Sequence, residues 1–338
     1  MSEPFLPDPS DAGERALLAR LLAGPVSGGA LAAELGVTRA AVWKRVEALR
    51  AGGVEIDARP GVGYAAPSAL AALGLLDAET IAGALPPAVR RSLARLEVAW
   101  SVDSTNSVLL RRPAPAATEV LFAERQTAGR GRRGRAWASP LGASLYLSLQ
   151  RRFEAPLVRL GGLSLAVGVA VAQALHALGL AQVGLKWPND LVVEREGVLH
   201  KLGGILIEFG GEAGGPVRAV VGIGINMRLP AVVAAAIDQP WCDVAGLAGQ
   251  DLPARNTVAA ALVARLVPML EAFDAEGLAP LQDAFAALDV LRGRTVRIVA
   301  GSQVHEGQAL GIAPDGGLRV RHADRERVWH AGEVSLRL

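Results

Sequence analysis

Cysteine is almost absent from this sequence: of 338 residues, only Cys242 carries a thiol. A single cysteine excludes a disulfide framework and a zinc site built from several cysteines. The five histidines do not recur at the spacing of metal ligands, so no metal site can be assigned with certainty. A Walker A sequence is also missing, which leaves a P-loop nucleotide site unsupported.

Charge of one sign is not in excess either. The 35 Lys and Arg residues oppose 33 Asp and Glu residues, a net charge of +2, so contact with nucleic acid would need a local basic patch. Residues 1–13 contain acidic side chains and prolines where a signal peptide has a basic start and an apolar core. We therefore expect a disordered tail there and a cytoplasmic protein.

The longest apolar stretch is Gly161–Leu180, which consists mainly of Ala, Gly, Leu and Val. It also carries Ser164, Gln173 and His176, and we interpret it as a buried helix rather than a membrane span. Hydrophobic residues make up 51% of the chain, enough for sizeable cores. The length predicts two or three domains at roughly 150 residues each, and no contact with membranes is expected.

Residues 14–67 form the first expected unit, a winged helix-turn-helix. An apolar helical face ends near Gly24, and a second short helix is expected over 30–35. Thr38 can cap a third helix over 39–51. Short extended runs on either side of a Pro-Gly turn complete the pattern, because three helices followed by a two-stranded ribbon are typical of this motif.

Residues 68–291 form the second expected unit, in which strands and helices are interleaved without βαβ repetition. This pattern favours an α+β fold with a mixed sheet. The expected strands are Leu96–Trp100, Glu119–Glu124, Ser144–Leu149, Val183–Trp187, Leu191–Glu194, Gly204–Glu208 and Val217–Ile225. The expected helices are Asn106–Arg112, Gly161–Leu178 and Asn256–Phe273.

Residues 292–338 form the third expected unit, which contains strands only. Several short runs alternate or nearly alternate between apolar and polar residues, and Pro314–Gly317 is a hairpin turn signal. Four or five short strands in so few residues predict a small barrel.

The most unusual stretch is Glu124–Ser139, with the sequence ERQTAGRGRRGRAWAS. Gly129, Gly131 and Gly134 satisfy G-x-G-x-x-G, but a dinucleotide site is rejected because a turn and a strand follow where a helix is needed. Glycine permits motion, and guanidinium groups bind phosphate or carboxylate. The stretch therefore predicts a mobile loop that closes over an anionic ligand; the alternative is a solvated basic loop that touches nucleic acid.

Four further segments could supply ligand groups, and each also has an ordinary structural explanation. Asp103–Asn106 leads into a helix N-terminus, which can bind small polar groups or simply be capped. Lys186–Asp190 presents an amide and a carboxylate from a strand end, or is only a good turn. Lys201–Gly204 places a lysine beside two glycines, or lies in a surface hairpin. Gly222–Asn226 has alternate glycines that leave a slot for a flat ligand, or that pack on a helix.

Taken together and in this order, the segments resemble the biotin protein ligases of the larger bacterial type, which double as biotin operon repressors. The resemblance covers nearly the whole chain and includes the N-terminal unit over Ser27–Tyr64. The matching motifs are DSTN at Asp103–Asn106, GRGRRGR at Gly129–Arg135, KWPND at Lys186–Asp190, KLGGIL at Lys201–Leu206, GIGINM at Gly222–Met227 and GEVSLR at Gly332–Arg337.

The resemblance implies a central α/β domain of the biotin/lipoate ligase type and a C-terminal SH3-like barrel. It implies a two-step reaction that needs ATP and Mg²⁺. The biotin carboxylate attacks the α-phosphate of ATP to give biotinyl-5′-AMP and pyrophosphate, and a lysine of the biotin carboxyl carrier protein of acetyl-CoA carboxylase then displaces AMP. Biotin is thus both substrate and precursor of the corepressor, and operator DNA and a ligand-promoted homodimer are implied as well.

Site residues follow from the same resemblance. The implied catalytic set is Lys201, Arg130, Arg132 and Asp190, in which Lys201 neutralises charge beside the carboxylate and the α-phosphate. The implied biotin-binding residues are Ser104, Thr105, Asn106, Gln126, Arg130, Gly131, Arg132, Tyr146, Lys201, Leu206, Gly222 and Gly224. The implied ATP or adenylate residues are Arg130, Arg132, Arg133, Trp137, Lys186, Asn189, Lys201 and Asn226. The implied DNA-binding residues are Arg39, Lys44, Arg45, Arg50 and Arg59.

Two departures from the family pattern leave alternatives open. Ala136 and Ala138 flank Trp137 where larger residues are usual, and Trp43 lies in the recognition helix where polar residues are more common. We expect Trp43 to be partly buried against the wing. A ligase that no longer binds DNA, a biotin-sensing transcription factor without ligase activity, and a lipoate ligase are the competing hypotheses.

Overall fold

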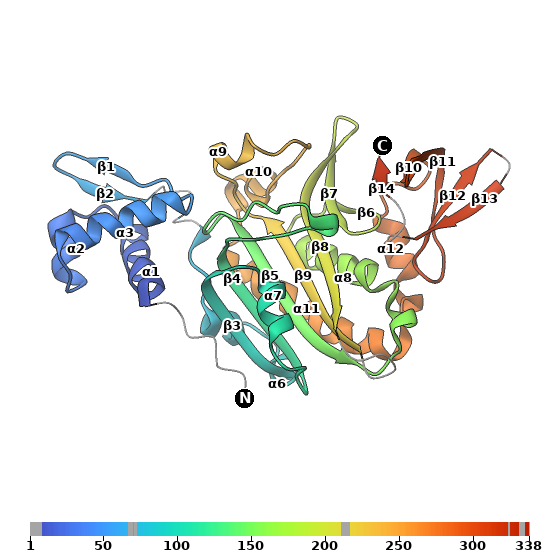
Figure 1. Cartoon of the computed structure of the whole chain (residues 1–338), viewed down its shortest axis with the longest axis horizontal. Coiled ribbons are helices and arrows are strands. Elements are labelled where there is room, and N and C mark those ends of the chain that lie inside the picture. Colours follow the sequence, from blue (N-terminus) through green and yellow to red (C-terminus); the bar gives the residue numbers. More distant parts are fainter. Residues whose placement is uncertain are drawn as a thin grey trace.

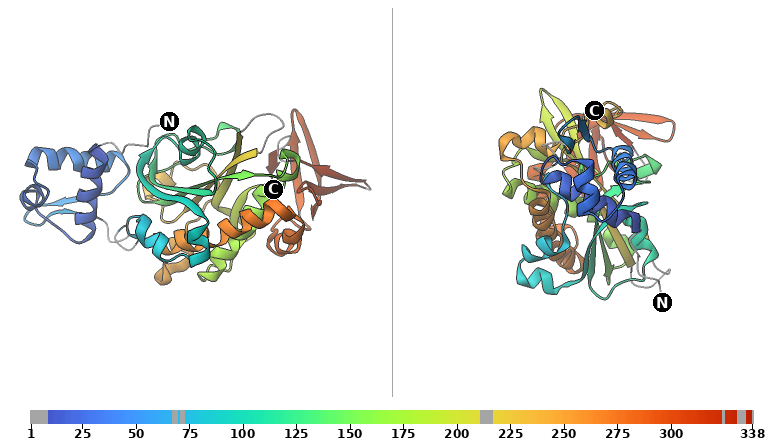
Figure 2. Two further views of the ribbon diagram at one scale, coloured as in Figure 1. Left: turned by 90° about the horizontal axis from the view of Figure 1, so that it is seen from below. Right: turned by 90° about the vertical axis from the view of Figure 1, so that its left-hand side faces the viewer.

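The computed structural model describes residues 9–66, 70, 73–210, 217–323, 325–330 and 335–337. A small N-terminal unit, a large central unit and a C-terminal unit lie in a row along the long axis of the molecule (Figure 1 and Figure 2). Helix α1 (Pro9–Leu22) begins inside the tail expected over 1–13, so that expectation is wrong for residues 9–13. The rest of the expected tail, residues 1–8, lies outside the described residues.

The N-terminal unit is the predicted winged helix-turn-helix. Helices α2 (Gly28–Glu34) and α3 (Arg39–Ala51) follow α1, and β1 (Asp57–Arg59) and β2 (Gly63–Ala65) pair as an antiparallel wing. The predicted cap is confirmed, because the Thr38 hydroxyl accepts a hydrogen bond of 3.1 Å from a backbone N–H in the first turn of α3. Leucine and valine side chains from the three helices fill the core of the unit.

The central unit is built on a seven-stranded mixed sheet, which confirms the predicted α+β class. The pair β3 and β4 is parallel, and the other neighbouring strands are antiparallel. Each predicted strand overlaps an observed one (Figure 1). Across the sheet the order is β3 (Leu93–Val102), β4 (Thr118–Gln126), β5 (Ser144–Phe153), β9 (Val217–Asn226), β8 (Val198–Gly210), β7 (Asp190–Arg195) and β6 (Val183–Lys186).

The two faces of this sheet have different surroundings. Helices α8 (Leu163–Ala177) and α11 (Arg255–Glu276) pack on each other and on one face, where they form the main core. Helix α7 (Thr105–Arg111) packs on β4, β5 and β9 at the opposite face. Because side chains alternate along a strand, β9 directs Ile223 into the main core and Gly222 toward the α7 side. The α7 side therefore has room for a ligand.

The apolar stretch forms the core helix α8, as predicted. The segment Leu157–Ala177 is long and apolar enough to cross a membrane, but 67% of its most apolar part is buried inside the protein. The hydrophobicity of α8 is explained by its packing between the sheet and α11. Five shorter helices were not among the predicted ones: α5 (Ala78–Gly83), α6 (Pro87–Arg91), α9 (Ala231–Ala234), α10 (Val244–Ala248) and α12 (Gln282–Leu288).

The C-terminal unit is a five-stranded antiparallel sheet, in agreement with the predicted strand-only fold. A register shift between Ala309 and Gly311 bends its second strand. In chain order the strands are β10 (Thr295–Ala300), β11 (Gln303–Ile312), β12 (Leu318–His322), β13 (Arg325–Trp329) and β14 (Ser335–Arg337). The first half of the predicted GEVSLR motif, residues 332–334, lies outside the described residues.

Candidate active site

A cavity lies on the α7 side of the sheet, over β8 and β9. Its walls come from segments far apart in the sequence: the start of α7, the loop over residues 129–137, the turn between β6 and β7, and the two strands. The predicted site residues that line it are Ser104, Thr105, Asn106, Gln126, Arg130, Gly131, Arg132, Arg133, Trp137, Lys186, Asn189, Asp190, Lys201, Leu206, Gly222 and Gly224.

The floor of the cavity is largely backbone, because glycines face it. A Cβ atom at Gly224 would lie 2.8 Å from the Trp137 indole, and one at Gly222 would lie 2.9 Å from Cγ of Asn106. These glycines therefore allow an indole and an amide to approach the strand closely. The space directly above Gly222 is occupied by Asn106 and that above Gly224 by Trp137, so a flat ligand lying on this strand stays a prediction. The buried Nε1–H of Trp137 has no partner among the described residues, which leaves a donor for a ligand.

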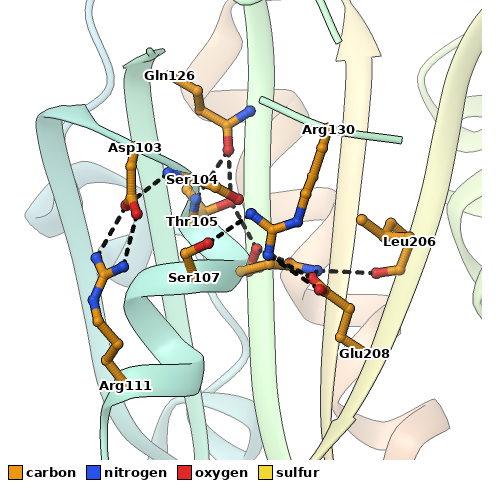
Figure 3. A network of polar contacts seen from close by, with 11 residues as sticks. Asp103, Ser104, Thr105, Ser107, Arg111, Gln126, Arg130, Leu206 and Glu208 are labelled. Carbon is orange, nitrogen blue, oxygen red and sulfur yellow. Dashed lines mark hydrogen bonds and ion pairs between the residues drawn. The ribbon is translucent and has the colours of Figure 1, made fainter. Parts of the chain in front are cut away.

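A chain of polar groups runs along the start of α7 (Figure 3). The Gln126 Oε1 atom accepts a hydrogen bond of 2.9 Å from the Thr105 backbone N–H. The Ser148 hydroxyl lies 2.7 Å from the Thr105 hydroxyl and 2.6 Å from Oδ1 of Asn106. The Ser104 hydroxyl, at the N-cap position of α7, makes no capping bond. The Ser104 hydroxyl can therefore serve a bound molecule.

The arginine-glycine loop over 129–137 is folded across the cavity. Its two arms pair with each other: the Trp137 N–H donates to the Gly129 carbonyl at 2.9 Å, and the Gly131 N–H donates to the Arg135 carbonyl at 2.7 Å. Arg133, at the tip, has a φ of 57°, a left-handed conformation that costs energy for a residue with a side chain. The glycines thus make a compact hairpin-like loop rather than a Rossmann turn, as predicted.

The second arginine of the loop reaches the KWPND turn. Arg132 donates a hydrogen bond of 3.2 Å from Nη1 to Oδ1 of Asn189, so the loop and this turn meet over the cavity. Burial lowers the pKa of the Arg132 guanidinium, because desolvation disfavours its charged form. A guanidinium that is poorly solvated gains most from an anionic ligand.

Lys201 and Asp190 form an ion pair of 2.7 Å at the edge of the cavity. The ammonium group also lies 5.5 Å from the centre of the Trp137 ring, within the range of a cation–π contact. The backbone of Lys201 is held on both sides: its N–H donates to the Pro240 carbonyl, and its carbonyl accepts from the N–H of Cys242. The cationic head is therefore positioned by both its backbone and its neighbours.

Positive charge is concentrated at this site. The whole chain has only three lysines, and two of them, Lys186 and Lys201, line the cavity. Four arginines of the loop join them, while Asp190 is the sole carboxylate among the lining residues. Around Thr105 and Asn106 the cavity is polar and the charge of Arg130 is balanced by Glu208, whereas the other end suits a polyanion.

Two predicted site residues lie elsewhere. Tyr146 is buried under the segment that follows the loop, and its hydroxyl donates to the Pro140 carbonyl at 2.9 Å. Burial raises the pKa of this phenol. Asn226 donates from Nδ2 to the carbonyl of Cys242 at 3.1 Å, beside Lys201, and does not line the cavity. Neither side chain lines the cavity in this structure, and their contact with ligand stays a prediction. Tyr146 holds the segment after the loop, and Asn226 holds the backbone beside Lys201.

The prediction missed three residues that support the cavity: Glu208, Ser107 and Trp187. Glu208 pairs with Arg130, whose Nη1 donates to the Ser107 hydroxyl at 2.6 Å (Figure 3). The spacing could have revealed Glu208, because it lies two residues beyond Leu206 and so shares its strand face. The third is Trp187, 2% exposed, whose Nε1–H donates to the Gly316 carbonyl of the C-terminal unit at 3.0 Å.

The predicted DNA-binding residues differ in their availability. Arg39, Lys44, Arg45 and Arg59 lie on α3 and on the wing, as predicted. Arg50 instead bonds to the Ile56 carbonyl at 2.6 Å and to Glu47 at 2.8 Å, so it ties α3 to the chain before the wing. Trp43, expected to be partly buried against the wing, is 56% exposed. An exposed indole on the recognition helix can contact a base or a sugar.

Comparison with known proteins connects the three units. Residues 14–65 match an HTH domain, residues 98–226 match the biotin/lipoate A/B protein ligase family, and residues 292–337 match the biotin protein ligase C-terminal domain. The bifunctional ligase/repressor BirA of Escherichia coli (strain K12) is 40% identical over 312 residues, which are 92% of each chain. The biotin–[acetyl-CoA-carboxylase] ligase of Mycobacterium tuberculosis is 36% identical over 71% of this chain and 88% of its own.

Solved structures show the same likeness. A biotin protein ligase from Aquifex aeolicus in complex with biotin and ATP aligns with a TM-score of 0.59 and 27% identity. The alignment covers 73% of this chain and 99% of that chain.

Proposed function

Because the chain belongs to the biotin protein ligases, in the group that joins a ligase to an N-terminal HTH domain, we propose that its cavity activates biotin with ATP. The observation that carries this proposal is the division of the cavity. An end of amide, hydroxyl and glycine groups suits a small neutral ring, and it adjoins an end where Arg132, Lys186 and Lys201 supply positive charge. Biotin has such a ring with a carboxylate tail, and ATP supplies the phosphates.

The reaction has two steps. A carboxylate oxygen of biotin forms a bond to the α-phosphorus of ATP as the bond to the pyrophosphate oxygen breaks, which gives biotinyl-5′-AMP and pyrophosphate. A lysine amine of the carrier protein then bonds to the acyl carbon, AMP leaves, and the amine loses a proton. Neither step needs a nucleophile from the ligase, so its task is to position reactants and stabilise charge.

The cationic end of the cavity fits that task. We place the α-phosphate and the carboxylate at Lys201, whose ammonium group is fixed between Asp190 and the Trp137 ring. Arg132 and Lys186 approach from the loop and from the strand end, where they can hold the phosphates. Asp190 keeps Lys201 oriented until the ligand's charge replaces it.

The end with amide and hydroxyl groups fits the biotin ring. Thr105, Asn106 and Gln126 present hydroxyl and amide groups, and Leu206 and the glycine floor at Gly222 give apolar and backbone contacts. Ser104 adds a hydroxyl that no capping bond uses. A ring that is apolar on its faces and polar at its edge matches this combination of groups.

Mg²⁺ is expected to arrive with ATP rather than to be held by a dedicated site. No cluster of three His, Cys, Asp or Glu residues occurs within the described parts of the chain. One carboxylate plus substrate phosphates suffices for Mg²⁺, and Asp190 is the carboxylate that lines the cavity. The ion would supply charge neutralisation on the pyrophosphate.

Biotin-dependent exchange of labelled pyrophosphate into ATP tests the ligase proposal. Replacing Lys201 with Ala is expected to raise the barrier by about 2–3 kcal/mol, the loss of one preorganised charge contact. Lys44→Ala is the matched control, because it removes the same side chain from the HTH unit. If wild type gives no exchange, or if Lys201→Ala exchanges as fast as Lys44→Ala, the proposed mechanism is wrong.

The HTH unit gives the protein a second role as a biotin-responsive repressor. The exposed Arg39, Lys44 and Trp43 present side chains for DNA on α3. We propose a cytoplasmic protein that dimerises when the adenylate forms and then binds paired half-sites near biotin synthesis genes. Wild type should shift such a DNA fragment in a gel when biotin and ATP are present. Lys201→Ala should shift it only when biotinyl-5′-AMP itself is supplied. A protein without any shift at low salt would be a ligase alone.

A further inference from the structure

Glu208 is the centre of a group of contacts behind the cavity wall (Figure 3). Its two carboxylate oxygens accept hydrogen bonds from Nη2 of Arg130 at 3.0 and 3.1 Å, and Oε2 also accepts from Nδ2 of Asn106 at 2.7 Å. Arg130 belongs to the loop, Asn106 to the start of α7, and Glu208 to β8. One carboxylate therefore connects the loop, the helix and the sheet, and it does not itself line the cavity.

The same carboxylate fixes the orientation of the Asn106 amide. Both Nδ2 hydrogens are used, one on Glu208 and one on the Leu206 carbonyl at 3.2 Å. Oδ1 must then face the Ser148 hydroxyl, which donates to it at 2.6 Å. The Glu208 carboxylate and the Leu206 carbonyl can only accept hydrogen bonds. If the amide turned over, its Oδ1 would face both of these acceptors and both hydrogen bonds would be lost.

The charge of Arg130 is already matched in this arrangement. Its Nη2 faces Glu208 and its Nη1 donates to the Ser107 hydroxyl. The side chains of Arg130 and Glu208 are 32% and 28% exposed, so their attraction is only partly screened by water. Arg132 and Lys186 enter the cavity from other segments, the loop tip and the end of β6.

We propose, on the basis of the ligase function above, that Glu208 is a positioning residue that clasps Arg130 and Asn106. The clasp holds the loop in its closed form before ligand arrives and presets the amide that meets the biotin ring. Arg130 accordingly acts through this clasp and not as a phosphate ligand. This assignment changes the role expected for Arg130 from the sequence.

The clasp has an asymmetric consequence. Removing Arg130 alone leaves a carboxylate without its cation beside a site for an anionic ligand, which costs more than removing both partners. Removing Glu208 alone releases the loop and leaves the amide free to turn. A Gln at position 208 cannot replace the Glu. Its single oxygen could accept from Arg130 and Asn106, but its NH₂ group would then face the Arg130 guanidinium, donor against donor.

Limited digestion of the ligand-free full chain with trypsin measures the clasp directly. Cleavage after Arg132, Arg133 and Arg135, mapped by mass spectrometry, follows the population of the open loop. Glu208→Gln is expected to speed these cuts by about threefold to tenfold, the worth of a partly exposed ion pair. The matched control is Glu97→Gln, which breaks an ion pair of 2.6 Å with Arg112 outside the cavity. Equal cleavage of the two variants would overturn the clasp.

Pyrophosphate exchange separates positioning from direct ligand binding. Glu208→Gln should raise KM for biotin by about threefold to tenfold with kcat changed by less than about twofold, since the reacting groups keep their charge. Arg130→Gln should lose more, and the double variant Arg130→Gln/Glu208→Gln should recover at least about threefold of the lost kcat/KM. A double variant no better than Arg130→Gln means that Arg130 binds the ligand itself, which refutes the proposal.

The digestion experiment and the exchange experiment test separate claims. If wild type shows no exchange, the ligase function falls while the digestion result still decides whether the clasp exists. Melting temperatures within a few degrees of wild type, measured for every variant, keep loop opening distinct from global unfolding.

Discussion

A methyl group at Gly222 is the smallest change that tests how the floor of the cavity works. The Cβ atom of Gly222→Ala would lie 2.9 Å from Cγ and 3.0 Å from Nδ2 of Asn106, and closer still to Oδ1. Asn106 is 3% exposed, and its amide is held by hydrogen bonds to Leu206, Glu208 and Ser148. The amide must therefore shift by roughly 0.5–1 Å to regain a normal contact distance.

Such a shift breaks hydrogen bonds that water cannot replace. The amide bonds to Leu206, Glu208 and the fully buried Ser148. Losing one or two of these bonds costs about 1–3 kcal/mol. If the same amide meets the biotin ring, as we propose, a loss of that size in binding corresponds to about 5-fold to 150-fold weaker biotin affinity.

Calorimetric titration with biotin and urea unfolding measure the two parts of this cost. Gly204→Ala is the matched control on the neighbouring strand, since its Cβ would meet nothing closer than 3.4 Å; its unfolding free energy should stay within about 1 kcal/mol of wild type. The double variant Asn106→Ala/Gly222→Ala removes the clash and should be more stable than Gly222→Ala. If Gly222→Ala binds biotin and unfolds like wild type, the amide is not fixed against the strand.

Three further predictions concern buried or paired groups. Glu124 forms a 2.6 Å ion pair with Arg255 in which both side chains are fully buried, so Glu124→Gln should lower the urea-unfolding free energy by about 3–5 kcal/mol; a loss below about 1 kcal/mol would contradict this. Burial raises the pKa of the Cys242 thiol to about 12, and iodoacetamide should label the native protein at neutral pH far more slowly than the urea-unfolded chain. Arg111 holds the pKa of Asp103 below its usual 3.8, so the ion pair stabilises the fold above pH 3.8 and this gain disappears as pH falls through the lowered pKa. Asp103→Asn should lack that step in unfolding free energy against pH.

Local signals in the sequence were enough for the helix-turn-helix and for the loop. Thr38 precedes an apolar helical pattern, and a capping hydroxyl needs only its own first turn to act. The loop at 129–137 was placed correctly because glycine frequency and the following turn are local properties. The alternation of side chains along a strand was equally reliable, since Gly222 and Gly224, two positions apart, face the same cavity.

Residues whose roles depend on long-range packing were placed less well. Tyr146 has the parity that directs it to the α7 side, but Pro140 comes back over it and takes its hydroxyl. Asn226 and Arg50 are satisfied by backbone carbonyls whose positions depend on the fold. Glu208 was missed because its partners Arg130 and Asn106 lie 78 and 102 positions away in the chain.

Both terminal units reach the cavity through the segments that form its walls. Trp187, in the turn that carries Asp190, donates its indole N–H to Gly316 of the C-terminal unit. At the other end, Trp100 and Leu141 of the central unit complete the apolar core of the winged helix-turn-helix. Each terminal unit is thus packed onto an element that also holds ligand groups.

The segment that leaves the loop makes the shorter of these connections. The Ser139 hydroxyl donates to the Trp137 carbonyl. Two residues later, the Leu141 N–H donates to the Gly52 carbonyl at 3.0 Å, and Gly52 caps the C-terminus of α3. Trp137 lies over the floor of the cavity, and only four positions separate it from Leu141. We therefore expect a displacement of the loop to reach the Leu141–Gly52 hydrogen bond at the end of α3.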